Sequence, residues 1–173
     1  MAIYVTSDAH GHVRALDEAL SKISLTSDDT LYVLGDMIVR GPDPVGVINL
    51  VRSLPNARVL KGNHEQIMLD AIIGQDPLDA ATWDINGGWT TRQQLNEMEF
   101  EAYEELVRWA AALPLYAVAE TAERPYLLVH AGIQAEAARA FLLEHGVDCA
   151  DGRGADDANS ELLQQMLAVQ SSD

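Results

Sequence analysis

Side chains of the types that bind divalent metal ions follow four short apolar segments of this sequence. In chain order they are Asp8, His10, Asp36, Asn63, His64 and His130. Carboxylate and amide oxygens suit hard cations, and imidazole suits transition metals such as Mn, Fe, Zn or Ni. One carboxylate between two ions can hold them about 3.5–4 Å apart, the spacing used in two-metal hydrolysis of phosphate esters. The residue types therefore predict a site for two divalent metal ions.

The segments that precede these side chains have the composition of buried strands. Short apolar runs with β-branched residues occupy 2–6, 30–34 and 57–60. Apolar residues recur at helical spacing over 13–23, 45–54 and 65–73. This alternation predicts an α/β fold in which helices connect the strands of one sheet. Because ligands of such sheets bind at the carboxyl ends of the strands, we expect the metal-binding side chains to converge there.

The rest of the chain is predicted to continue a single domain over 1–173. The segment 78–113 has a helical pattern throughout, carries all three tryptophans and is interpreted as a cap beside the sheet. The runs 115–119 and 126–129, separated by a polar turn, predict a β-hairpin. Farther along the chain we expect a helix at 135–145, a polar loop at 149–159 and a weak helix at 160–169.

Four ordered motifs resemble those of the calcineurin-like metallophosphoesterases. They are SDAHG (7–11), GDMIVRGP (35–42), GNHE (62–65) and VHAG (129–132). A longer match, VLKGNHEQIMLDAI together with NGGWTT at 86–91, is similar to the bacterial serine/threonine phosphoprotein phosphatases related to the bacteriophage lambda phosphatase. Symmetrical diadenosine tetraphosphatases share much of this pattern. The resemblance implies the α/β/β/α sandwich of the family, without its C-terminal strands.

The resemblance also implies which residues bind the metals. Asp8 and His10 match ligands of a first ion. Asp36 matches the carboxylate that bridges two ions, and Asn63 and His130 match ligands of the second ion. The cofactor implied is a pair of divalent ions, with Mn favoured over Fe, Zn, Ni or Mg.

The residues that act on the substrate are implied in the same way. His64 matches the histidine that protonates the leaving alkoxide, and Arg40 matches an arginine that grips phosphate oxygens. Asn63 and Lys61 match positions that contact the substrate, although a solvated lysine is an equally good interpretation of Lys61. The nucleophile implied is a hydroxide that bridges the two ions and attacks in line, without a phosphoenzyme intermediate.

Val39 departs from the family pattern, which usually has an aspartate that orients and charges the histidine equivalent to His64. We predict a weakened general acid, so activity should survive best on substrates with a good leaving group. The test compares rates for an activated aryl phosphate and an alkyl phosphate. Equal aryl-to-alkyl ratios in the wild type and in Val39→Asp would contradict this prediction.

The C-terminal part of the sequence also departs from the family. The pattern continues after VHAG to a tryptophan–arginine segment and a late Gly-His-Thr strand, and neither is present before the final SSD. We expect the second metal to lack one histidine ligand and the sheet to lack strands. Sheet edges left without partners favour pairing between copies, so a homodimer is expected.

Several other residues carry structural interpretations that outweigh functional ones. His12 is assigned to a helix start, and His145 to a helix C-terminus, where its charge is favourable without a metal. The tryptophans are interpreted as core or cap packing rather than as platforms for nucleobases; they are Trp83, Trp89 and Trp109. For 86–88, a simple turn and a part of the substrate cleft have equal weight.

The composition limits the classes of partner. A net charge of −16, with only 11 Lys and Arg residues, argues against binding of nucleic acid, which needs cations to neutralise phosphates. Bound metal ions can still reverse the sign of the potential inside one cleft. The sequence has no apolar run of membrane-spanning length and a single cysteine, so we expect a cytoplasmic protein without a membrane partner.

Taken together, these features predict a metal-dependent phosphoesterase that hydrolyses phosphate monoesters, either protein phosphoserine and phosphothreonine or small phosphate esters. The alternative substrate is a dinucleoside tetraphosphate cleaved symmetrically. An alternative of another class is a nonhydrolytic remnant that binds a metal or a phosphate, supported by Val39 and the missing C-terminal ligand.

Overall fold

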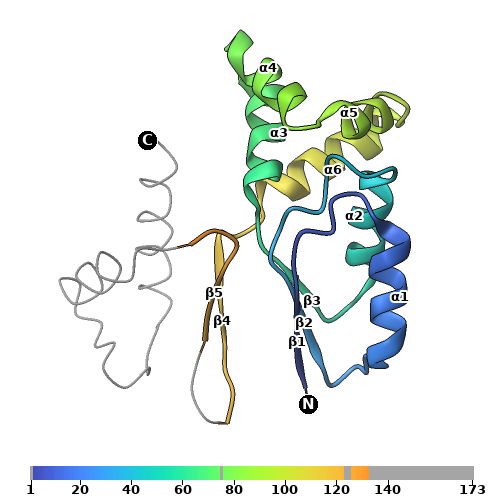
Figure 1. The fold of residues 1–173 in the computed structure, drawn as a ribbon, viewed down its shortest axis with the longest axis vertical. Coiled ribbons are helices and arrows are strands. Elements are labelled where there is room, and N and C mark those ends of the chain that lie inside the picture. Colours follow the sequence, from blue (N-terminus) through green and yellow to red (C-terminus); the bar gives the residue numbers. More distant parts are fainter. Residues whose placement is uncertain (1, 75, 123–125, 133–173) are drawn as a thin grey trace, which may run out of the picture. The chain divides into compact units, whose positions relative to one another are not determined.

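The computed structural model describes residues 2–74, 76–122 and 126–132 (Figure 1). These residues belong to two compact units, which divide between Leu113 and Pro114. The elements of the first unit are β1 (Ile3–Thr6), α1 (Val13–Ile23), β2 (Thr30–Val33), α2 (Pro44–Ser53), β3 (Ala57–Val59), α3 (Asn63–Ile73), α4 (Pro77–Ile85), α5 (Trp89–Asn96) and α6 (Phe100–Ala111). The second unit contains β4 (Tyr116–Ala119) and β5 (Tyr126–Val129).

The first unit is built on a parallel sheet with the strand order β1-β2-β3. The register pairs Ile3 with Thr30 and Leu31 with Ala57. The helices α1 and α2 connect these strands, as the sequence predicted (Figure 1). Since all three strands run the same way, their carboxyl ends lie at one edge of the sheet, where the loops after β1, β2 and β3 meet.

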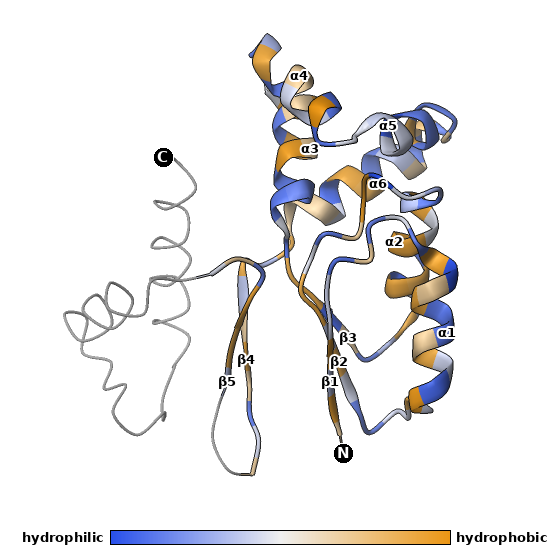
Figure 2. Ribbon diagram, viewed as in Figure 1, coloured by the Kyte–Doolittle hydropathy of each residue, from blue (hydrophilic) through white to orange (hydrophobic). Residues whose placement is uncertain are grey.

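Apolar side chains of β2 and α2 form the centre of the core. Leu31 and Val33 are almost fully buried in β2, as are Val47, Ile48 and Val51 in α2. Figure 2 shows apolar colouring over much of α2, whereas polar and apolar residues alternate along α1. The contrast follows from position, because α1 buries only one stripe of its surface.

The segment 78–113 is helical but not continuous, because it leaves the helical conformation at 86–88, between α4 and α5, and at 97–99, between α5 and α6. The prediction of helix throughout is wrong at these two turns. The first turn, at 86–88, contains Gly87 with a φ of 86°, in the left-handed region that favours glycine. It also contains Gly88, where an added Cβ would lie 2.3 Å from Cδ1 of Trp83. The buried Trp83 indole therefore packs against backbone that only glycine leaves open.

The second unit confirms the predicted hairpin. β4 and β5 pair antiparallel, with Tyr116 opposite Val129 and Ala119 opposite Tyr126. The elements expected at 135–145, 149–159 and 160–169 lie outside the described residues. Within the described ranges, no helix combines the length and the apolar character that crossing a membrane requires.

Asp29 anchors the N-terminal side of the sheet. Its carboxylate accepts hydrogen bonds from Ala2 N and from both the backbone N–H and the hydroxyl of Thr26. These bonds favour the charged form, so they lower the pKa of Asp29 below its ordinary value of 3.8.

We expect this carboxylate to make the stability of the chain fall in acid. Because the unfolded chain takes up the proton at the higher pH, the contribution of Asp29 is complete above 3.8 and is lost as pH falls through the lowered pKa. Urea unfolding of the wild type and Asp29→Asn between pH 6 and pH 2 checks this. The difference in unfolding free energy should shrink at the acid end, and a constant difference would contradict the assignment.

Candidate metal centre

The loops that follow β1 and β2 carry strained backbone. Six non-glycine residues of the described chain have φ in the left-handed region, and five of them lie in these two loops: Asp8, His10, Asp36, Val39 and Arg40, with φ values of 56°, 42°, 52°, 65° and 66°. Each such residue costs about 1–3 kcal/mol and persists only where surrounding contacts impose it. Four of the five are predicted site residues, and Val39 is the fifth.

His10 presents one ring nitrogen to the carboxylates of both loops. Its Nδ1 lies 3.0 Å from Ile38 O, so Nδ1–H donates and the lone pair belongs to Nε2. Nε2 lies 3.8 Å from Asp8 Oδ1 and 3.9 Å from Asp36 Oδ2. A backbone carbonyl that fixes the imidazole tautomer in this way is typical of histidines that bind metals.

Asp36 belongs to the loop after β2, and its side chain contacts the N-terminal end of α3. Its carboxylate is buried, with Oδ1 accepting from His64 N at 3.1 Å and Oδ2 lying 3.7 Å from His64 Nε2. The helix begins at Asn63, two residues before the predicted start, so Asn63 and His64 belong to its first turn. The N-terminal end of a helix dipole favours an anion at this point.

Gly62 allows Asp36 to approach α3 so closely. A Cβ added at Gly62 would lie 2.3 Å from Asp36 Oδ1. At Gly35, whose φ is 86°, an added Cβ would lie 2.3 Å from Gly62 N. The ends of β2 and β3 can therefore pack in direct backbone contact only because both positions are glycine.

Glu65 holds the two loops together, a function that the sequence analysis missed. Its side chain is fully buried; Oε2 accepts from Asp36 N and Gly62 N, and Oε1 accepts from Met37 N, each at 2.8 Å. Burial raises the pKa of Glu65, and the three N–H bonds act in the opposite direction. The available signal was an acid at the third position of a helix, which is the capping-box position.

Arg40 brings a positive charge next to His10 and His64. One guanidinium nitrogen donates to His10 Nε2 at 2.9 Å, and the other donates to His64 Nε2 at 3.0 Å. Ligand atoms of His10, Asp36 and His64 lie within 4.8 Å of one another. Two imidazole lone pairs and a carboxylate thus lie around one place, where the positively charged guanidinium of Arg40 already binds. This donor set fits a divalent transition metal ion.

The remaining predicted site residues have different surroundings. Asn63 is exposed at the first position of α3. Lys61 Nζ donates to Ala111 O at 3.1 Å, so it caps the C-terminus of α6, and burial lowers its pKa. His130 directly follows β5 in the second unit. The binding roles assigned to these three residues stay predictions.

The backbone around Val39 is tied to the segment that begins α5. Val39 is fully buried within the hydrophobic core, and its N–H donates to Thr91 Oγ1 at 3.1 Å. Arg40 N donates to Gly87 O at 3.2 Å. A valine with positive φ is unusual, because its branched Cβ crowds the carbonyl group. The effect of Val39 on the acid strength of His64 stays a prediction.

The tryptophans differ in their surroundings. Trp83 is buried beneath Arg92, whose guanidinium carbon lies 4.8 Å from the ring centroid, and Trp109 contacts Arg52 in a similar way at 5.5 Å. The packing interpretation holds for these two. It is wrong for Trp89, which is 62% exposed.

Comparison with known proteins places this site in context. The calcineurin-like phosphoesterase family model matches residues 1–165. The chain is 31% identical over 136 residues to a symmetrical bis(5'-nucleosyl)-tetraphosphatase of Erwinia tasmaniensis, and 32% identical over 139 residues to that of Proteus mirabilis. Each match covers 77% of this chain and 45% of the relative, so the chain spans less than half the length of these relatives.

A solved structure shares the fold. A protein serine/threonine phosphatase from Saccharomyces cerevisiae aligns with a TM-score of 0.55 at 21% identity, covering 92% of this chain and 47% of that chain. The likeness confirms the predicted α/β fold class. The family match over most of the sequence shows that this chain belongs to the calcineurin-like phosphoesterases, a family that binds divalent metal ions.

Proposed function

We propose that the chain hydrolyses phosphoric esters and anhydrides with divalent metal ions held at the ends of β1, β2 and β3. One observation carries this proposal. Ligand atoms of His10, Asp36 and His64, which lie in the loop after β1, the loop after β2 and the first turn of α3, are within 4.8 Å of one another beside the Arg40 guanidinium. Strained backbone in the two loops supports a functional origin for the arrangement.

The residues divide into metal ligands and substrate contacts. The proposed ligands of two ions, with Mn favoured, are Asp8, His10, Asp36, Asn63 and His130. Bound ions of this kind lower the pKa of water and neutralise charge on phosphate. Arg40 would move from the imidazoles to two phosphate oxygens, which its planar fork can bind together. His64, with its ring nitrogen beside Arg40 and Asp36, would hold the proton that the leaving oxygen needs.

The proposed substrate is a dinucleoside tetraphosphate cleaved symmetrically. Support comes from the relatives that are 31% and 32% identical to the chain and are named as symmetrical bis(5'-nucleosyl)-tetraphosphatases. The metal ions would bind the polyphosphate, which the overall charge of −16 would otherwise repel. Phosphoprotein and other monoester substrates belong to the same reaction class and are therefore compared in the same experiment.

The test is a substrate panel with the full chain. Diadenosine tetraphosphate, a phosphoserine peptide and p-nitrophenyl phosphate are each incubated with protein stripped by a chelator and then supplied with Mn²⁺. Metal-dependent release of ADP as the nucleotide product supports symmetrical cleavage. Faster turnover of the peptide would favour the monoester substrate. No turnover of any substrate, with one weakly bound ion by calorimetry, would overturn the proposed hydrolysis and favour a nonhydrolytic remnant.

A further inference from the structure

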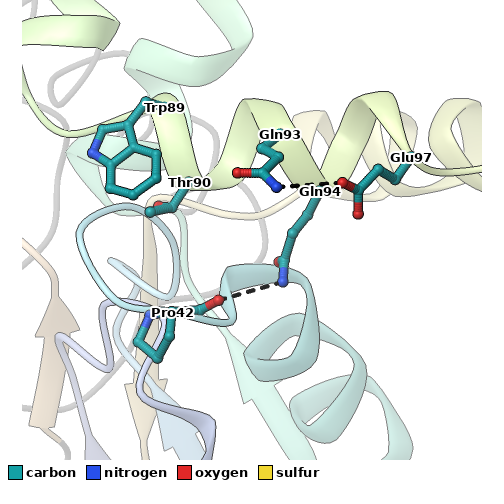
Figure 3. A pocket seen from close by; sticks show the side chains of 6 residues that line it. All are labelled: Pro42, Trp89, Thr90, Gln93, Gln94 and Glu97. Atoms are coloured by element: carbon teal, nitrogen blue, oxygen red, sulfur yellow. Dashed lines mark hydrogen bonds between the residues drawn. The ribbon is translucent and has the colours of Figure 1, made fainter.

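A small cavity lies between α5 and the loop that carries Arg40. It measures about 320 Å³ and is lined by Pro42, Trp89, Thr90, Gln93, Gln94 and Glu97 (Figure 3). Four of these residues are spaced so that they share one face of a helix, at 90, 93, 94 and 97. The volume is at the lower end of the range for pockets that bind small molecules.

Hydrogen bonds fix this cavity relative to Arg40. Gln94 Oε1 accepts from Val45 N at 2.9 Å, and Gln94 Nε2 donates to Asp43 Oδ1 at 3.0 Å, so this side chain joins α5 to the loop. Figure 3 shows Gln94 extending from α5 to Pro42. Arg40 N also donates to Gly87 O, just before α5. Hydrogen bonds therefore join α5, which lines the cavity, to the loop that carries Arg40, the proposed phosphate contact.

Two side chains at the cavity have groups that the described protein leaves largely uncovered or without a hydrogen-bond partner, the Trp89 indole and the Thr90 hydroxyl. Trp89 is 62% exposed, although an indole is a large apolar surface that folding normally covers. Thr90 is only 7% exposed, yet its Oγ1 has no hydrogen-bond partner among the described residues. A buried hydroxyl without a partner is costly, and a ligand that supplies the partner would remove that cost.

The charge of the lining selects against an anion. None of the six residues is basic, and Glu97 would repel a phosphate at close range. A neutral planar ring would instead stack on Trp89, with ring nitrogens for the Thr90 hydroxyl. An amino group on the ring could donate to Gln93 Oε1 or to the Glu97 carboxylate.

From this geometry we infer that the cavity binds the nucleobase of a nucleotide substrate, with Trp89 as the stacking surface and Thr90 as a polar contact. The inference rests on the proposed function for the identity of the substrate, since it places the base beside a phosphate held at Arg40. The pocket itself is built without any metal ligand. Base binding can therefore be measured separately from hydrolysis.

The first experiment uses metal-free protein and observes the indole N–H signals by NMR. Adenosine, which lacks phosphate, should shift the signal that is missing from Trp89→Phe and leave those of Trp83 and Trp109 in place. Ribose 5-phosphate, which lacks a base, should shift none of them. An unchanged Trp89 signal with adenosine, or an equal shift with ribose 5-phosphate, would overturn the inference whether or not the chain is a hydrolase.

The second experiment uses kinetics with diadenosine tetraphosphate and p-nitrophenyl phosphate. Trp89→Ala should raise KM for the nucleotide roughly five- to 100-fold, which corresponds to the loss of one stacked base. Its kinetics with the small aryl phosphate should not change, and Trp89→Phe should restore most of the affinity. Phe100→Ala is the matched control, because Phe100 is an aromatic residue that is 71% exposed and does not line the cavity.

The variant Thr90→Val distinguishes an effect on ligand binding from an effect on stability, because the two are expected to change in different ways. It should raise KM for the nucleotide about two- to tenfold by removing one hydrogen bond. The unfolding free energy should stay the same or rise, because the hydroxyl has no partner in the described protein. Equal losses of activity on both substrates in Trp89→Ala and Thr90→Val would show a structural role and overturn the assignment. Absence of all turnover would refute the proposed function and leave the NMR result to decide the pocket.

Discussion

Replacing Asp36 by asparagine is expected to lower kcat/KM by roughly 10³-fold, because several kcal/mol of metal-dependent charge stabilisation would be lost. Asp36 Oδ2 faces both imidazoles, and the proposed second metal shares this carboxylate. Asparagine keeps an oxygen that can accept from His64 N, so the first turn of α3 should remain in place. Steady-state kinetics over a range of Mn²⁺ concentrations, with calorimetric counting of bound ions, measures the effect.

Asp29→Asn is the matched control for this variant. Both residues are mostly buried aspartates that flank β2, but Asp29 precedes the strand and Asp36 follows it. The control removes the same charge and should retain activity near pH 7. Wild-type turnover by Asp36→Asn at saturating metal would contradict the proposed role. A loss shared equally by both variants would point to stability instead.

Replacing Glu65 by glutamine is expected to destabilise the fold by about 3 kcal/mol, since a buried N–H without an acceptor costs about 1–3 kcal/mol. The carboxylate accepts from three backbone N–H groups. Glutamine has one oxygen, and its own N–H₂ group would face at least one of these donors. Urea unfolding should show a lower midpoint with an unchanged slope.

The control for Glu65 is Glu101→Gln. Glu101 also occupies the first turn of a helix, α6, but is exposed. Its replacement should change the unfolding free energy by no more than about 0.5 kcal/mol. If the two variants unfold at the same urea concentration, then Glu65 does not hold the loops. Metal affinity supplies a second measurement, because Glu65→Gln should weaken binding by releasing Asp36 from its position.

Local patterns in the sequence were sufficient to predict most of the fold. Apolar runs and helical spacing located α1 and the strands of the first unit to within one or two residues, because burial on one side produces these periodicities directly. The connections were predictable as well, since helices between strands impose a parallel sheet. The proximity of His10, Asp36 and His64 was predictable from the same reasoning, because the carboxyl ends of parallel strands lie at one edge of the sheet.

What the sequence did not reveal depends on contacts between distant segments. Glu65 was recognisable only as part of a motif, because its three donors come from residues up to 29 positions away. For 86–88 the sequence left a turn and a part of the substrate cleft equally open, because the packing of Trp83 against Gly88 is recorded by no periodicity. The exposure of Trp89 could not be inferred either. A tryptophan in an amphipathic segment gives the same pattern whether or not a neighbouring helix covers it.

The left-handed residues after β1 and β2 bear on how this lineage can evolve. Asp8 is an exposed acid at a φ of 56°, a conformation that glycine adopts without strain. A descendant released from selection for catalysis would gain stability by substituting glycine there, whereas the proposed metal-binding role of Asp8 predicts that an active one retains the aspartate. Glycine at position 8 in a natural homologue would therefore mark a pseudoenzyme, recognisable from sequence before any assay.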